Sequence, residues 1–226
     1  IGAFFYPENK KTLPITIEGT NIPLAQTHVE NLGSAQVKSS LMAAFLNTPG
    51  RSTIIDEKVS RNHTEILLKK ISADIKVKKL KKGNLISVKG QKNLHAFNYT
   101  VGNDPSSSAP LIVLTLLTPG SKLTLPGVIC NDTRIGFIKI LKKMNANIII
   151  KNLKRDLNSG ELLGTIVAYS SKLKPITVSK NVPKFIDELP LLFICAALQN
   201  GISKFFNCGE LIHKETNRLL EIKKIL

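Results

Sequence analysis

The chain has 226 residues, of which 42% are hydrophobic, so it can build one large domain or two small ones and is not a disordered protein. Its net charge is +16, but only five of the 32 basic residues are arginines and few aromatic side chains lie between the lysines. This pattern favours solvated lysine-rich surfaces over a nucleic-acid groove, so we expect no nucleic-acid partner. Attraction of anionic small molecules is the alternative.

Cysteine and histidine usage gives no sign of disulfides or metal. Cys130, Cys195 and Cys208 are odd in number and form no CxxC pair, which indicates reduced thiols and a cytoplasmic location. The histidines are far apart, so we expect no metal site and no cofactor. The longest apolar run, 109–117, is too short to cross a membrane, so we expect no membrane partner. Because the chain starts with Ile1 and has no secretory signal, we expect an internal piece of a longer protein.

The first part of the chain alternates predicted strands with two predicted helices. Ser34, Ala35 and Gln36 lead into the first helix, which is apolar, and Thr48-Pro-Gly50 ends it. The motif that starts at Ser60 opens the second. The predicted elements are strands at 12–18 and 22–29, a helix at 37–46, a strand at 52–56, a helix from 60 to about 71, and strands at 74–78 and 84–88.

The same order of elements then recurs. The predicted elements are an apolar helix from 104 to about 118, a strand at 122–125, a helix at 131–144, strands at 147–152 and 161–168, an apolar helix from 187, a strand at 203–206 and a helix at 214–226. The apolar helices begin near 34, 105 and 187, which indicates a repeat of mixed elements. We therefore expect an α/β protein built from repeated βαβαββ units that bury their apolar helices against one another.

Polar residues stand at the predicted helix starts in every copy. If the apolar helices pack in parallel, these starts converge on one end, where free N–H groups and helix dipoles favour phosphate or carboxylate. The residues are Ser34, Gln36, Ser60 and Arg61 in the first copy, Asp104, Ser106 and Ser107 in the second, and Asp187, Lys214 and Glu215 in the third.

Acids and cations are combined in the last copy. Asp187 and Glu188 precede an apolar run, and Lys214, Glu215 and Arg218 fall within one turn of the last predicted helix. On that helix Lys214 and Arg218 share a face. Two acids, two cations and a helix start together can hold an anion and move a proton.

Five segments of the chain, in this order and spacing, resemble the central part of the 5-enolpyruvylshikimate-3-phosphate (EPSP) synthase family. They are 34–39 (SAQVKS), 60–65 (SRNHTE), 104–107 (DPSS), 186–190 (IDELP) and 210–218 (ELIHKETNR). The resemblance implies the enolpyruvyl transferase fold, with two domains that are both incomplete here: 1–100 in the first domain and 101–226 in the second. It also implies a monomer with its active site between the domains.

The resemblance further implies a reaction and roles for individual residues. The enolpyruvyl group of phosphoenolpyruvate moves to the 5-hydroxyl of shikimate 3-phosphate, and phosphate is released. The base would be Asp187, while Glu215 would take part in proton transfer at the enolpyruvyl carbon. The implied ligands of shikimate 3-phosphate are Ser34, Ala35, Gln36, Arg61, Asp187 and Lys214. The implied ligands of phosphoenolpyruvate are Gln36, Glu215 and Arg218.

Some positions depart from the family pattern. Ile212 stands where the family usually has Arg, and Asn217 stands where it usually has Asp. Asn103 and Pro110 also differ from the usual surroundings of Asp104. Further family motifs for both substrates lie outside this chain, so we expect the piece alone to bind and turn over substrates poorly.

Two other function classes stay open. A sister enolpyruvyl transferase that acts on a UDP-linked amino sugar shares the repeat, but we would not expect the 34–36 and 214–218 segments in it. A basic, non-catalytic binding module of the same fold is the more distant alternative. Exchanging shikimate 3-phosphate for a UDP-linked amino sugar as the acceptor distinguishes the first alternative from the shikimate enzyme. Loss of turnover in the intact protein would favour the second.

Overall fold

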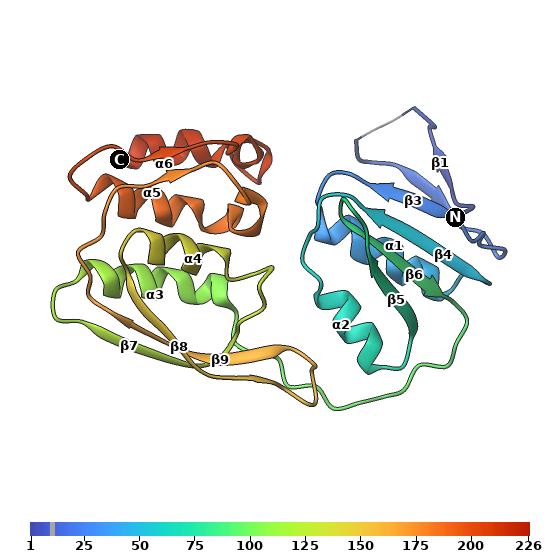
Figure 1. Ribbon diagram of the computed structural model, residues 1–226. Coiled ribbons are helices and arrows are strands. Elements are labelled where there is room, and N and C mark those ends of the chain that lie inside the picture. Colours follow the sequence, from blue (N-terminus) through green and yellow to red (C-terminus); the bar gives the residue numbers. More distant parts are fainter. Residues whose placement is uncertain (10–11) are drawn as a thin grey trace. The chain divides into compact units, whose positions relative to one another are not determined.

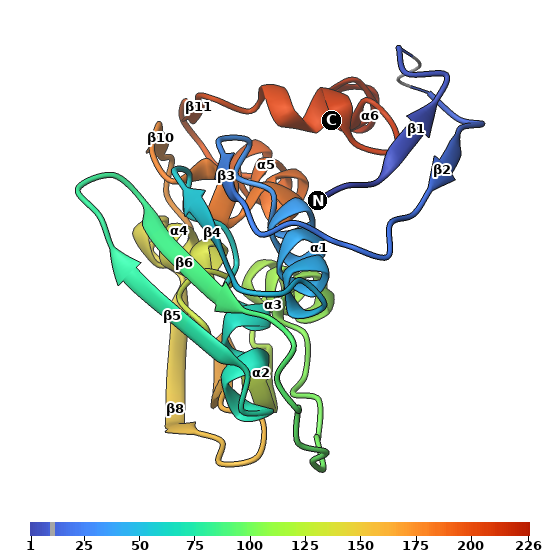
Figure 2. The same ribbon diagram turned by 90° about the vertical axis from the view of Figure 1, so that its right-hand side faces the viewer.

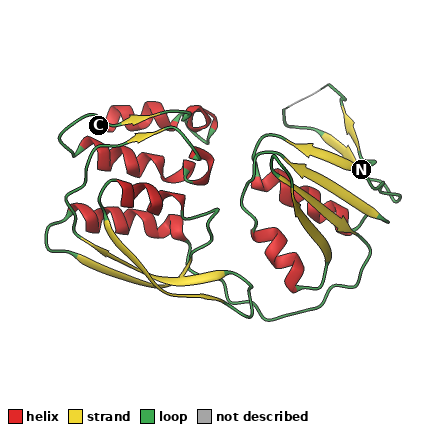
Figure 3. Cartoon of the chain, in the orientation of Figure 1, coloured by secondary structure: helices red, strands yellow, loops and turns green. Residues whose placement is uncertain are grey.

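The computed structural model describes residues 1–9 and 12–226 (Figure 1). The chain forms two compact units, Ile1–Asn98 and Tyr99–Leu226. Each unit combines helices with a sheet, which confirms the predicted α/β class (Figure 3). Within the described residues, we find no helix that is both long enough and apolar enough to span a bilayer.

The first unit has a four-stranded mixed sheet in the order β3-β4-β6-β5. Helices α1 and α2 provide the buried side chains that pack on one face, together with Ile54 and Ile86 of the sheet (Figure 2). A separate antiparallel pair, β1 and β2, precedes the sheet. The elements are β1 Phe4–Tyr6, β2 Thr16–Glu18, β3 Thr27–Glu30, α1 Ala35–Leu46, β4 Arg51–Asp56, α2 His63–Lys70, β5 Asp74–Lys79 and β6 Asn84–Lys89.

The first two strands are shorter than predicted. Apolar and polar residues alternate from 12 and from 22, but pairing is confined to Thr16–Glu18 and Thr27–Glu30. Pro14 and Pro23 lie in the parts that do not pair. Because proline has no backbone N–H, it cannot donate to a sheet ladder, and this limits both strands.

The second unit has a three-stranded antiparallel sheet in the order β7-β9-β8, over which helices are stacked (Figure 1). A short parallel pair, β10 and β11, follows. The elements are α3 Pro105–Leu117, β7 Lys122–Ile129, α4 Gly136–Lys143, β8 Asn147–Arg155, β9 Leu162–Tyr169, β10 Thr177–Val178, η1 Val182–Lys184, η2 Ile186–Glu188, α5 Leu189–Ala197, β11 Lys204–Phe205, η3 Gly209–His213 and α6 Arg218–Ile225.

The predicted repeat is present in the sheet topology. In the first unit β4 runs parallel to β3, which precedes α1, and antiparallel to β6. In the second unit, β7 forms a parallel bridge with Asn103, which precedes α3, and pairs antiparallel with β9. The pair β10 and β11 flanks α5 in the same parallel sense. Three copies of one pattern therefore start in this chain.

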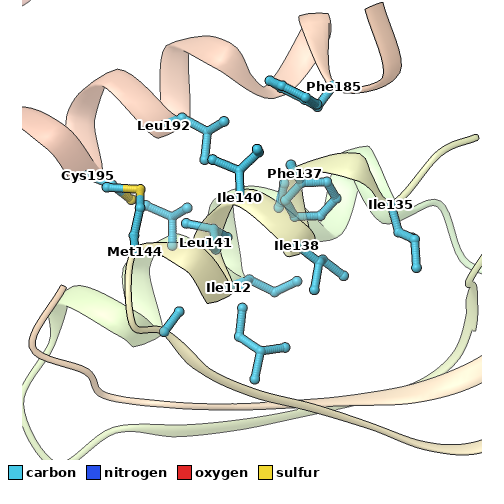
Figure 4. Close-up of a cluster of buried hydrophobic side chains, with 14 of the residues drawn as sticks. Ile112, Ile135, Phe137, Ile138, Ile140, Leu141, Met144, Phe185, Leu192 and Cys195 are labelled. Atoms are coloured by element: carbon cyan, nitrogen blue, oxygen red, sulfur yellow. The ribbon is translucent and has the colours of Figure 1, made fainter. Parts of the chain in front are cut away.

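The core of the second unit lies where α3, α4 and α5 meet (Figure 4). Ile112, Leu141 and Leu192, one from each helix, are fully buried there. Burial also raises the pKa of the Cys195 thiol to about 12, so this cysteine behaves as a small apolar residue. The apolar helices thus pack on each other, as their composition predicts.

Candidate functional site

The two predicted cations of the last segment meet a predicted acid in the second unit. Lys214 Nζ lies 3.4 Å from Asp187 Oδ1, and an Arg218 guanidinium nitrogen lies 3.6 Å from the same oxygen. Asp187 comes from η2, Lys214 follows η3 and Arg218 is the first residue of α6. All three side chains are partly buried, so their mutual interaction is screened less than that of a surface pair.

Two further acids border this cluster. Glu215 Oε1 accepts a 2.5 Å bond from Arg218, and Glu210 Oε1 lies 3.2 Å from Lys214. The hydrogen bond from Arg218 lowers the pKa of Glu215. Both acids are mostly solvent-exposed, whereas Asp187 is not. Within the second unit, the structure therefore brings together all four site residues that the sequence predicts there.

The local structure of the last segment differs from the prediction of a helix at 214–226. Lys214 has extended backbone, and α6 begins only at Arg218. The Asn217 side chain accepts a 3.1 Å bond from Leu220 N–H, which fixes the helix start there. Lys214 and Arg218 therefore do not share a helix face. They converge because a bend between η3 and α6 turns both towards Asp187.

The starts of the helices in the second unit lie together. Ser106, in the first turn of α3, donates a very short hydrogen bond to Glu188, which directly precedes α5. Arg134, just before α4, lies 2.7 Å from Asp104, the N-cap of α3. Burial raises the pKa of Asp104, but the bonds from Ser107 and the Arg134 charge outweigh it and the net shift is downward. The predicted convergence of helix starts thus holds inside this unit.

The predicted residues of the first unit stand at the start of α1. Ser34 is the N-cap and accepts a 3.3 Å bond from Val37 N–H, while Ala35 and Gln36 form the first turn. Gln36 is exposed and Ala35 is partly buried. The first turn of α1 carries no acidic residue, so the helix start keeps its preference for an anion.

Arg61 and Ser60 lie in the connection between β4 and α2. The second helix was expected to open at Ser60, but α2 begins at His63 with Asn62 as its N-cap. Ser60 is therefore no helix cap. Its hydroxyl is buried and, among the described residues, finds no hydrogen-bond partner. A buried hydroxyl without a partner can bind a ligand. The sequence feature that points to Ser60 is its position directly before Arg61.

The described residues hold no cluster of three or more His, Cys, Asp or Glu side chains that could bind a metal ion. The functional groups described above are instead cations, hydroxyls and carboxylates. Within each unit these groups gather where helices begin. This arrangement defines a repeat-built α/β protein equipped to hold anionic ligands beside groups that can transfer protons.

Comparison with known proteins identifies the family. The sequence model of EPSP synthase (3-phosphoshikimate 1-carboxyvinyltransferase) matches residues 2–226, so the chain belongs to the EPSP synthase family.

The chain is 40% identical over 218 residues to the 3-phosphoshikimate 1-carboxyvinyltransferase of Caldicellulosiruptor saccharolyticus, with 96% of this chain and 50% of that protein covered. It is 38% identical over 213 residues to the enzyme of that name from Helicobacter pylori, covering 94% of this chain and 48% of that protein. The structure of EPSP synthase from Acinetobacter baumannii matches with a TM-score of 0.84 at 33% identity, over 99% of this chain and 49% of that one. The chain thus spans about half the length of these relatives.

Proposed function

We propose that this chain forms the central part of a 3-phosphoshikimate 1-carboxyvinyltransferase. That enzyme transfers the enolpyruvyl group of phosphoenolpyruvate to the 5-hydroxyl of shikimate 3-phosphate and releases phosphate. Besides the family membership, the observation that carries this proposal is the meeting of Asp187 with Lys214 and Arg218 beside Glu215. A carboxylate among cations suits a reaction in which two anions exchange a group and protons move.

The groups of the second unit serve the proton transfers in this proposal. The acceptor hydroxyl loses its proton as the new C–O bond forms, and Asp187 takes that proton. The methylene carbon of phosphoenolpyruvate gains a proton and later returns one when phosphate leaves, and Glu215 takes part in both transfers. Lys214 binds shikimate 3-phosphate, whereas Arg218 pairs with phosphoenolpyruvate.

The groups of the first unit bind shikimate 3-phosphate in this proposal. Ser34 and Ala35 present the start of α1, and Arg61 pairs with the phosphate. Gln36, which is exposed, contacts both substrates. The buried, unpaired hydroxyl of Ser60 supports a phosphate ligand beside Arg61, because a bound phosphate oxygen would accept its hydrogen bond.

The departures from the family pattern are compatible with this function. Asn217 caps α6 through its side-chain oxygen, which is the part that aspartate and asparagine share. Ile212 is 47% exposed, so an arginine there would lie largely in solvent, where a single charge contributes little. These two positions therefore do not by themselves favour the non-catalytic alternative.

The remaining expectations belong to the same proposal. Residues 1–100 are part of the first domain and 101–226 part of the second, and the intact enzyme is a cytoplasmic monomer without a metal or cofactor. Gel filtration with light scattering of the intact protein tests the monomer. A dimer mass would overturn that part alone.

The test of the function is phosphate release from phosphoenolpyruvate by the protein extended to the length of its relatives. Shikimate 3-phosphate is the acceptor, and a UDP-linked amino sugar is the control. Release only with shikimate 3-phosphate supports the proposal. Release only with the UDP-linked acceptor assigns the chain to the sister transferase, and release with neither favours a binding module.

A further inference from the structure

An ion cluster lies buried beneath the proposed shikimate 3-phosphate segments of the first unit. Lys38 is 1% exposed, and its Nζ lies 3.3 Å from Asp56 Oδ2 and 2.8 Å from Glu65 Oε1. The three residues come from α1, β4 and α2. None of them has a role in the proposed chemistry. A buried ion cluster is a weak source of stability, because desolvation offsets its attraction, so another role has to be considered.

Each member of the cluster supports a different part of the proposed binding site. Lys38 lies one turn after Ser34, and its backbone N–H bonds to the Ser34 carbonyl at 3.1 Å. Asp56 is the last residue of β4, from which the chain runs to Ser60 and Arg61. Glu65 follows Arg61 in the first turn of α2. The ammonium of Lys38 therefore ties the three supports of the site together.

A second set of bonds extends this framework. Glu30, also buried, accepts hydrogen bonds from the backbone N–H groups of Leu32 and Gly33, just before Ser34. Glu30 is paired in register with Asp56 across β3 and β4. The hydroxyls of Ser39 and Thr64 join α1 to α2 at 2.7 Å. The segments before Ser34 and around Arg61 thus rest on one polar network.

The charges of this network are unevenly balanced. Lys38 is the cation that the described structure places between Asp56 and Glu65, while Glu30 adds a third carboxylate nearby. Burial raises the pKa of Asp56 and the Lys38 charge offsets this in part. One oxygen of Glu65 is buried and finds no hydrogen-bond partner in the part of the chain that the structure describes. The geometry of the network therefore depends on where one ammonium group lies.

We propose that Lys38, Asp56 and Glu65 are positioning residues that hold the start of α1 and the Ser60-Arg61 connection at the spacing that shikimate 3-phosphate requires. This inference rests on the proposed function. None of the three touches substrate. They act through the segments that do, because a binding group displaced by about 1 Å loses much of its effect.

The first test is Glu65→Gln in the protein of full family length. Glutamine keeps the size of Glu65 and an oxygen for Lys38, but it removes one charge. We expect the dissociation constant of shikimate 3-phosphate, measured by titration calorimetry, to rise by about 10- to 100-fold. The KM of phosphoenolpyruvate at saturating shikimate 3-phosphate should rise less, because Gln36 is the one residue at the start of α1 that is proposed to contact it. Ile54→Val is the matched control, because it removes a buried methyl group on the same face of β4 and leaves every charge in place.

A triple variant separates positioning from stability. Lys38→Met with Asp56→Leu and Glu65→Leu replaces all three charged side chains by apolar ones, which leaves no buried charge without its partner and commonly leaves stability unchanged or higher. If the cluster positions the site, this stable variant still binds shikimate 3-phosphate weakly. In an Arg61→Ala background Glu65→Gln should add less than it does alone, because its effect passes through that segment.

The outcomes also distinguish this inference from the proposed function. Wild-type affinity for shikimate 3-phosphate in both Glu65→Gln and the triple variant overturns the positioning role and leaves the function standing. Equal weakening by Ile54→Val at matched thermal stability overturns it as well, since general loosening then explains the effect. A parent protein that neither binds shikimate 3-phosphate nor releases phosphate removes both conclusions.

Discussion

The ammonium of Lys214 lies 3.4 Å from a carboxylate oxygen of Asp187, although α5 and β11 separate the two residues in the sequence. Arg218 approaches the same oxygen from the start of α6. One carboxylate thus faces two cations from a different part of the chain. That contact is the observation behind our proposal that Asp187 acts as a base.

Asp187→Asn in the intact protein should lower kcat by roughly 10²- to 10⁴-fold, since an amide cannot take the proton of the acceptor hydroxyl. The KM of both substrates should change little, because Lys214 and Arg218 keep their charges and lose a competing carboxylate. Steady-state phosphate release measures both constants.

Glu210→Gln is the control for that variant, because Glu210 also pairs with Lys214 but lies on the exposed side of the cluster. It should keep kcat close to that of the parent protein. If Asp187→Asn and Glu210→Gln give the same kcat, Asp187 only balances charge and the base lies elsewhere.

Arg61→Ala should weaken shikimate 3-phosphate binding, because the proposed phosphate contact is lost and the start of α1 is left to hold the anion. A charge-assisted hydrogen bond contributes about 1.5–3 kcal/mol, so the dissociation constant should rise by roughly 10- to 150-fold. Titration calorimetry measures it. Lys69→Ala removes an exposed charge at the far end of α2 and controls for long-range attraction. Equal weakening in both variants would place the phosphate away from Arg61.

Much of the fold was predictable because its signals are local. The apolar helices follow from long runs of apolar residues, and the strands β4 to β6 follow from alternation bounded by turns. The repeat then fixed the order of elements. The starts of β2 and β3 were predicted too early. The prediction followed the alternation of apolar and polar residues and gave too little weight to Pro14 and Pro23, which have no backbone N–H to donate.

The site was predictable only in part, because its geometry depends on tertiary contacts. The motif located Lys214 and Arg218, but not the bend that separates them from a common helix face. Lys38 could not be distinguished in sequence from the many surface lysines. It is buried because Asp56 and Glu65 reach it from other elements, and no local pattern records that.

Arg218→Gln should raise the pKa of Glu215. The hydrogen bond and the charge of Arg218 stabilise the ionised carboxylate, so their loss favours the protonated form and moves the pKa back towards 4.5. Carbon-13 NMR of the side-chain carboxyl, titrated without substrates, measures the shift. Lys224→Gln, which removes the partner of Glu221 in the same helix, is the control. An unchanged Glu215 pKa in Arg218→Gln would mean that the two side chains do not pair in solution.

Asn217→Ala should loosen the start of α6, whereas Asn217→Asp should not. The Asn217 side-chain oxygen accepts the Leu220 N–H, and replacing such a cap by alanine costs about 1 kcal/mol, while aspartate offers the same acceptor. Amide hydrogen exchange at Leu220 should therefore become faster by roughly fivefold in the alanine variant and stay slow in the aspartate variant. Thr216→Ala, one residue earlier and exposed, is the control. Because Arg218 is the first residue of α6, the alanine variant should also raise the KM of phosphoenolpyruvate. Unchanged exchange at Leu220 would show that α6 starts without this cap, and the departure at position 217 would then need another explanation.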